Sequence, residues 1–142
     1  MIIDHDDTHD VLQNTLIKVW KGLGKFRADS GFYTWLYRIA TNEALSFIKK
    51  NNKYLTRSLN ISAIEGQAYY EDDPLYSGSE ISMRLHKAVL SLPQKQQLVF
   101  NMKYFDELKY EEISEILGTS VGALKTSYHL AVKKIEKQVL TD

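Results

Sequence analysis

Histidines and carboxylates gather near the start of the chain, in the stretch "DHDDTHD" at residues 4–10. His5 and His9 are four residues apart among four aspartates, and imidazole with carboxylate is a ligand set for divalent metals. Acidic residues are also favoured in the first turn of a helix, where they meet the positive end of the helix dipole. A helix start with solvated charge accounts for the stretch better, so we expect no metal and no cofactor.

The other polar residues give no catalytic arrangement. Glu111 and Glu112 are adjacent, so their side chains point in different directions on a helix and cannot serve one site. No glycine-rich phosphate loop or Ser-His-Asp arrangement stands out, and the chain has no cysteine. We therefore expect a protein that is not an enzyme.

A cluster suited to holding a nucleotide base lies in "FRADSGFYTWLYRIATNEAL", residues 26–45. Phe26 and Arg27 open the "RADSG" turn, and Arg38, Ile39 and Asn42 follow at helical spacings of three and four residues. An aromatic ring can stack on a base, and an amide can bond its edge. This stretch is either a base-binding pocket or simply a core helix.

The aromatic residues of the same stretch divide between these two interpretations. Trp35 lies on the apolar face of the expected helix and is interpreted as core. Tyr33 and Tyr37 lie at the edge of that face, and both roles stay open for them. The expected apolar face contains Phe32, Trp35, Leu36, Ile39, Ala40 and Phe47, and the opposite face contains Thr34, Arg38, Thr41 and Lys49.

These residues are positioned by helices, since no strand pattern appears anywhere. Before the cluster, a helix follows the cap candidates Asp7 and Thr8, with apolar residues spaced by three and four up to the "GLGKF" turn. Residues 56–80 lose this periodicity and mix Gly, Ser, Pro and acids, as a flexible linker does. Helical periodicity returns at Ile81, and Pro93 stands at a helix start. We expect an all-α protein.

The end of the chain has the pattern of a helix-turn-helix. Ile113 and Ile116 point inward from a short helix, Gly118 ends it in a left-handed conformation, and Ser120 caps a longer helix. The expected inward stripe of that helix is Val121, Leu124, Tyr128, Ala131, Val132, Ile135 and Val139. Its outward side carries Gly122, Thr126, His129, Lys133 and Lys137, with Lys125 at the edge. Such a face can enter a DNA major groove, although a plain helical hairpin has similar spacing.

The composition fits a nucleic-acid-binding protein of the reducing cytoplasm. The 142 residues carry equal numbers of basic and acidic side chains, but residues 1–55 and 83–142 are each net +2, and residues 56–82 are net −4. Two weakly basic segments thus flank an acidic one. No apolar run is long enough to cross a bilayer, and the acidic start is unlike a signal peptide, so we expect no membrane insertion and a cytoplasmic location.

The two ends together resemble the bacterial RNA polymerase sigma factors. "DVLQNTLIKVWKGLGKFRADSGFYTWLYRIATNEALSFIKK" is similar to region 2 of the sigma-70 family, and "LPQKQQLVF…YEEISEILGTSVGALK" to region 4. The short linker with no intervening domain resembles the extracytoplasmic-function (ECF) subgroup. The resemblance implies two small helical domains, region 2 at 1–55 and region 4 at 81–142, joined by the linker at 56–80.

The resemblance implies a transcription initiation factor. Region 2 is expected to bind the β′ clamp helices of core RNA polymerase and to read the −10 promoter element as single strand. Region 4 is expected to bind the β flap and to read the −35 element as duplex DNA. An anti-sigma factor is a further expected partner.

We assign three groups of site residues. The resemblance implies Asp10, Gln13, Asn14, Phe26, Ile39, Asn42, Lys125, Thr126 and His129, and the other members are added because of their neighbouring or outward positions. Polymerase contacts fall on Asp10, Gln13, Asn14 and Lys18. Single-strand contacts at the −10 element fall on Phe26, Arg27, Tyr37, Arg38, Ile39 and Asn42. Duplex contacts at the −35 element fall on Lys125, Thr126, His129, Lys133 and Lys137.

The chain departs from the family pattern in three respects. The family usually has Glu at the position of Asn14. Family members commonly carry arginines on the last helix where Lys125, Leu130 and Val132 stand, and lysine lacks the bidentate fork of arginine. The chain also begins inside region 2, so we expect the first helix to lack part of its packing partner and to expose apolar surface. The alternative to a sigma factor is a stand-alone helix-turn-helix regulator with an unrelated helical N-terminal module.

Overall fold

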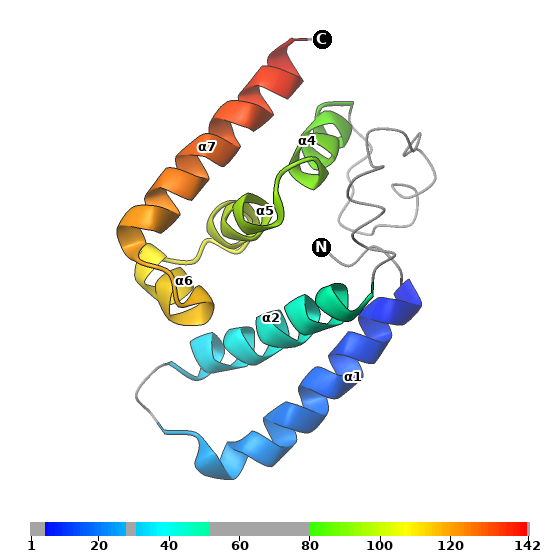
Figure 1. The fold of residues 1–142 in the computed structure, drawn as a ribbon, viewed down its shortest axis with the longest axis vertical. Coiled ribbons are helices and arrows are strands. Elements are labelled where there is room, and N and C mark those ends of the chain that lie inside the picture. The colour runs from blue at the N-terminus through cyan, green and yellow to red at the C-terminus, as the bar shows by residue number, and fades with distance from the viewer. Residues whose placement is uncertain (1–4, 28–30, 52–79, 142) are drawn as a thin grey trace.

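All regular elements of the described residues are helical, in agreement with the all-α prediction (Figure 1). The computed structural model describes residues 5–27, 31–51 and 80–141. The predicted linker therefore lies outside the described residues except for Glu80, and so do three residues of the "RADSG" turn, 28–30.

Helices α1 (His5–Gly22) and α2 (Phe32–Lys50) form an antiparallel hairpin (Figure 1). A 3₁₀ turn, η1 (Leu23–Lys25), follows α1 directly. Gly22 lets the two helices approach closely, because a Cβ atom there would lie 3.0 Å from the Trp35 ring. An ion pair between Lys18 and Glu43 also joins the helices.

The hairpin buries different residues from those that the sequence predicted. Thr34 and Thr41 were expected on the outward face of α2, yet they are only 5% and 6% exposed. Phe32, expected in the core, is 48% exposed. The reason is that α2 packs on two sides, against α1 and against α6 (Tyr110–Leu117), so its threonine face is covered as well.

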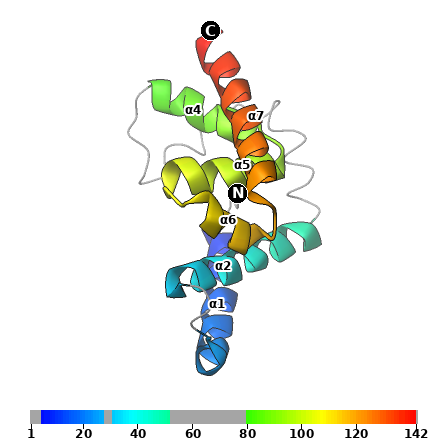
Figure 2. The same cartoon turned by 90° about the vertical axis from the view of Figure 1, so that its left-hand side faces the viewer.

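The second half of the chain is built around α7 (Val121–Leu140). Helix α4 (Glu80–Leu90) and helix α5 (Gln94–Phe100) pack against it, and a π-helical turn, η2 (Asn101–Phe105), continues α5 toward α6. Pro93 is the N-terminal cap of α5, as expected. Figure 1 shows α4 and α5 on one side of α7, and Figure 2 shows α6 between α7 and α2.

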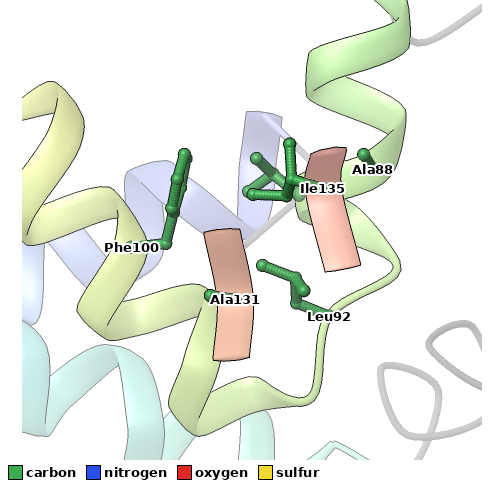
Figure 3. Packing of buried hydrophobic residues seen from close by; sticks show 6 residues of the cluster. Ala88, Leu92, Phe100, Ala131 and Ile135 are labelled. Carbon is green, nitrogen blue, oxygen red and sulfur yellow. The ribbon is translucent and has the colours of Figure 1, made fainter. Parts of the chain in front are cut away.

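Two apolar clusters form the core of this half. The first joins α4, α5 and α7, and Figure 3 shows its labelled residues between these helices. It consists of Ala88, Val89, Leu92, Phe100, Ala131 and Ile135. The second joins α5, η2, α6 and α7 and consists of Val99, Met102, Leu108, Ile113, Ile116 and Leu124. We call the second one the α6 cluster.

Candidate nucleic-acid interface

Helices α6 and α7 form the helix-turn-helix that the sequence predicted. Gly118 ends α6 with φ of 66°, a left-handed conformation that costs a side-chain-bearing residue about 1–2 kcal/mol. The hydroxyl of Ser114 donates a 2.7 Å hydrogen bond to the carbonyl of Thr119 and holds the turn against α6. Ser120 then caps α7, its hydroxyl accepting from the backbone N–H of Ala123 at 3.3 Å.

The inward face of α7 is anchored firmly. Leu124 and Ala131 are completely buried, and Ile135 is 7% exposed. Leu124 packs in the α6 cluster with Ile113, which is also completely buried. The remaining members of the predicted stripe, Val121, Tyr128, Val132 and Val139, are half-buried.

The outward face of α7 carries every residue predicted to read duplex DNA. All five side chains are exposed: Lys125, Thr126, His129, Lys133 and Lys137. Their spacing keeps them within about a third of the helix circumference, at about 100° per residue. The Thr126 hydroxyl donates to the Gly122 carbonyl within the same helix, at 3.2 Å. Small and polar side chains therefore lie toward the N-terminal end of α7, and two lysines lie farther along.

Two residues beside this face, Lys103 and Tyr110, were not identified from the sequence. The ammonium of Lys103, in η2, lies 4.6 Å from the centre of the Tyr110 ring, and that of Lys125 lies 5.8 Å from it. Both distances are within the range of cation–π attraction. Tyr110 thus orients Lys125 from α6. No spacing rule connects residues on three different elements, so the sequence could not indicate this contact.

The aromatic residues of the hairpin gather at its closed end. The Phe26 ring contacts the Trp35 ring, with centres 5.1 Å apart, and the Phe32 ring, with centres 5.5 Å apart. Trp35 is half-buried by these contacts, which agrees with its expected structural role. Arg27, just beyond Phe26, is exposed.

The other predicted pocket residues lie farther along α2. Ile39 is half-buried and Asn42 is exposed. Asn42 is seven residues beyond Trp35, or about 10 Å along the helix axis. Among the described residues, no hydrogen bond or ring contact joins Phe26 to Ile39 or Asn42. The single-base pocket therefore stays a prediction.

Tyr37 and Arg38 point toward the second half of the chain. The Tyr37 ring packs against the α6 cluster, and its hydroxyl donates a hydrogen bond to the Asp106 carboxylate. The Arg38 guanidinium donates through Nε to the backbone carbonyl of Glu115 at 3.0 Å. Partial burial raises the pKa of the Asp106 carboxyl. These two predicted DNA contacts are thus engaged with α6 and its neighbouring turn.

Helix α1 exposes a polar face and an apolar face. The predicted polymerase contacts Asp10, Gln13, Asn14 and Lys18 are all exposed. Apolar side chains that the sequence pattern placed on one stripe are exposed too, in agreement with the predicted exposure of apolar surface on this helix. They are Leu12 at 50%, Leu16 at 58%, Trp20 at 78% and Leu23 at 45%.

The acidic residues have local roles. Glu112 accepts a 3.0 Å hydrogen bond from the backbone N–H of Lys109 and so caps α6, whereas Glu111 is exposed. His5 and His9 contact each other edge to face, with ring centres 4.7 Å apart. Within the described residues, no three histidine or carboxylate side chains are placed to hold a metal ion.

Comparison with known proteins identifies both halves. The family "Sigma-70 region 2" matches residues 1–54, and "Sigma-70, region 4" matches residues 82–135. The ECF RNA polymerase sigma factor SigW of Bacillus subtilis is 32% identical, over 94% of this chain and 75% of that protein. The chain belongs to the sigma-70 family. The ECF sigma-E factor of Escherichia coli K12 is 30% identical over 94% of this chain and 74% of its own length.

A solved structure extends this ECF likeness to three dimensions. The sigma factor RpoE of Bartonella quintana, crystallised with the anti-sigma factor NepR, aligns with a TM-score of 0.76 and 25% identity. The alignment covers 99% of this chain and 86% of that one.

This sigma factor is a transcription initiation factor that directs RNA polymerase to promoters. Sigma factors are not enzymes. The match to region 2 disfavours the alternative, a stand-alone helix-turn-helix regulator with an unrelated N-terminal module. None of the described helices has the length and apolar character that crossing a membrane requires.

Proposed function

We propose that the two halves of this sigma factor divide promoter recognition between duplex and single-stranded DNA. Helix α7 reads the −35 element as duplex, and the α1–α2 hairpin reads the −10 element as single strand. The observation that carries the proposal is the outward face of α7, where all five predicted DNA contacts are exposed while the opposite face is anchored by buried Leu124.

On α7, position along the helix sets each residue's role. In helix-turn-helix proteins the N-terminal part of the recognition helix contacts base edges. Lys125, Thr126 and His129 occupy that part, and Lys133 and Lys137 follow one and two turns later. We assign the first three to base edges and adjacent phosphates and the last two to phosphates alone.

In the hairpin, binding energy must compensate for opening the duplex. Extruding a base from the stack costs a few kcal/mol, and stacking on an aromatic ring returns about 1–3 kcal/mol. Phe26 offers such a ring, Ile39 offers an apolar wall, and the Asn42 amide can hydrogen-bond a base edge. We assign Arg27, Tyr37 and Arg38 to contacts with the strand on either side of that base, although the structure has Tyr37 and Arg38 bound to Asp106 and Glu115.

Polymerase binding is assigned to α1. Asp10, Gln13, Asn14 and Lys18 form its exposed polar face, which we propose contacts the β′ clamp helices, while region 4 contacts the β flap. We further propose an anti-sigma partner, since the similar RpoE was crystallised with one. The protein acts in the cytoplasm with core polymerase, without a cofactor and without catalysis of its own.

The test is assembly with bacterial core polymerase followed by run-off transcription. Gln13→Ala combined with Asn14→Ala should weaken capture of core polymerase and leave helicity unchanged, because both side chains are exposed. Gln94→Ala, an exposed glutamine on α5, is the control. If the double variant captures polymerase as the parent does, the assignment to α1 is wrong. If the parent itself supports no promoter-specific transcript, the whole proposal fails.

A further inference from the structure

One large apolar side chain lies beside the residues of α7 that are proposed to read duplex DNA. Leu130 is 44% exposed, and it belongs to neither of the two apolar clusters of region 4. Figure 1 shows α7 along an outer edge of the described fold. A single exposed leucine is common and needs no explanation by itself. The place of Leu130 on the helix therefore decides whether it has a role.

Helical spacing places Leu130 close to Thr126 on the surface of α7. At about 100° per residue, Leu130 lies about 40° around the helix from Thr126, whereas Lys125 lies about 100° from it. Leu130 is four residues beyond Thr126, or about 6 Å farther along the axis. It is thus nearer to the Thr126 position than Lys125, which is already assigned to DNA. A major groove that takes up Thr126 therefore takes up Leu130 as well.

The two edges of the outward face of α7 differ in chemistry. One edge carries Lys125. On the other edge Ala123 and Leu130 are seven residues apart, so they lie only about 20° apart around the helix, and both are exposed. The Thr126 hydroxyl donates its hydrogen to the Gly122 carbonyl, which leaves the methyl group of Thr126 for contacts outside the helix. We call Ala123, Thr126 and Leu130 the apolar row.

Only one base offers an apolar group in the major groove. That group is the C5-methyl of thymine, whereas the edges of guanine, cytosine and adenine present hydrogen-bond donors and acceptors there. A leucine side chain gains by covering the methyl group. If it covers a donor or acceptor instead, that group loses its hydrogen bond to water without a replacement, which costs free energy. Leu130 therefore favours thymine and disfavours the other bases.

We infer that Leu130 is a specificity-determining residue of the −35 contact, and that its side chain packs against the C5-methyl of a thymine in the major groove. The inference rests on the proposed reading of duplex DNA by α7. Because 6 Å along the helix corresponds to about two base pairs at about 3.4 Å per pair, this thymine lies within about two pairs of the one that Thr126 contacts. The −35 element of this sigma factor thus contains a thymine, on one strand or the other.

Replacing thymine by uracil in the DNA removes that methyl group and nothing else. The full chain is assembled with bacterial core polymerase, and promoters that bind are selected from a library whose −35 element is randomised. Each thymine of the enriched −35 element is then replaced in turn by deoxyuridine. The affinities of the parent, Leu130→Ala, Leu130→Met and Leu140→Ala are measured for each duplex. Leu140 is the matched control, because it is an 81% exposed leucine at the end of the same helix.

We expect one thymine whose replacement by uracil weakens binding of the parent about 3- to 5-fold, the effect of losing one buried methyl group. In Leu130→Ala the same replacement should have almost no effect, since the side chain that covers the methyl group is gone. Leu130→Met keeps an apolar side chain and should keep the uracil effect. Leu140→Ala should respond to uracil as the parent does.

Two kinds of failure are distinguishable. If no thymine of the −35 element responds to uracil, or if Leu130→Ala keeps the full response, Leu130 reads no methyl group and duplex reading by α7 still stands. The inference is also overturned if Leu140→Ala loses the response, because the loss is then not local to the apolar row. If the parent enriches no −35 sequence at all, the proposed function of α7 fails, and the inference fails with it.

Discussion

Region 4 and the α1–α2 hairpin of region 2 differ in how much apolar core lies beneath their exposed polar residues. Region 4 has two apolar clusters with completely buried Val99, Ile113 and Leu124, and its DNA-reading face lies outside them. The hairpin buries Val11 and Ile48 but leaves Leu12, Leu16 and Trp20 exposed. Region 4 is therefore stabilised by its own core, whereas the hairpin presents apolar surface together with its polar contacts.

The largest expected effect is on stability, and it is tested by replacing one leucine with alanine in each of the two regions. Leu124→Ala should lower the free energy of unfolding by about 2–5 kcal/mol, because it leaves a cavity in a closed core. Leu16→Ala, at a position that is 58% exposed, should change it by less than about 0.5 kcal/mol. Chemical denaturation followed by circular dichroism measures both. Similar losses in the two variants would mean that the hairpin is packed as firmly as region 4.

The next largest effect is expected on DNA binding, where variants along α7 test which residues read bases and which bind phosphates. Thr126→Ala should cost about 1–3 kcal/mol at one promoter position and relax the preference there. Lys133→Ala should weaken binding to all sequences and reduce the salt dependence by about one phosphate contact. Titration of a −35 duplex library at several salt concentrations separates the two. Identical behaviour of the variants across the library would refute the assignment.

A comparable effect is expected in the hairpin, on a different step. Asn42→Ala should leave folding, polymerase capture and −35 binding unchanged, because the side chain is exposed, but should impair promoter melting. A promoter with a pre-melted bubble should restore part of the activity, since the cost of extruding the base has then been met. Permanganate footprinting of the open complex gives the measurement, with Ser46→Ala as the control. Normal melting by Asn42→Ala would place the pocket elsewhere.

The smallest expected effect compares two glycines of the helix-turn-helix. Gly118→Ala should destabilise region 4 by about 1–2 kcal/mol, because φ is 66° there. Gly122→Ala lies in helical backbone with open space around it and should stabilise by about 0.5–1 kcal/mol. Thermal unfolding reports both signs. If both variants changed the stability in the same direction, the left-handed turn at Gly118 would not explain the effect.

The sequence predicted region 4 better than the hairpin, for a physical reason. In region 4 the periodic apolar residues meet one another, so helical spacing alone places Leu124 inside and Lys133 outside. Gly118 and Ser120 also have local backbone roles that depend only on their neighbours in the chain. Such features can be read directly from residue type and spacing.

In the hairpin, the spacing of residues along a helix does not indicate which other element packs against a given face of that helix. Helical spacing predicts that the threonine face of α2 points outward, although Thr34 and Thr41 are buried and α2 also packs against α6. The contacts of Tyr37 with Asp106 and of Arg38 with Glu115 join residues 69 and 77 positions apart. Pairings of that kind depend on tertiary packing, which no local pattern encodes.

The placement of the two tryptophans gives this protein a built-in optical reporter. The chain has only Trp20 and Trp35, so all tryptophan fluorescence comes from the hairpin and none from region 4. Trp20 is 78% exposed and should emit at long wavelength, whereas the Trp35 ring contacts the rings of Phe26 and Phe32 in a less polar setting. A molecule that covers α1 would shift the emission of Trp20 to the blue. Unfolding of the hairpin would shift the emission of Trp35 to the red. Binding at α1 and unfolding of the hairpin therefore shift the tryptophan emission in opposite directions.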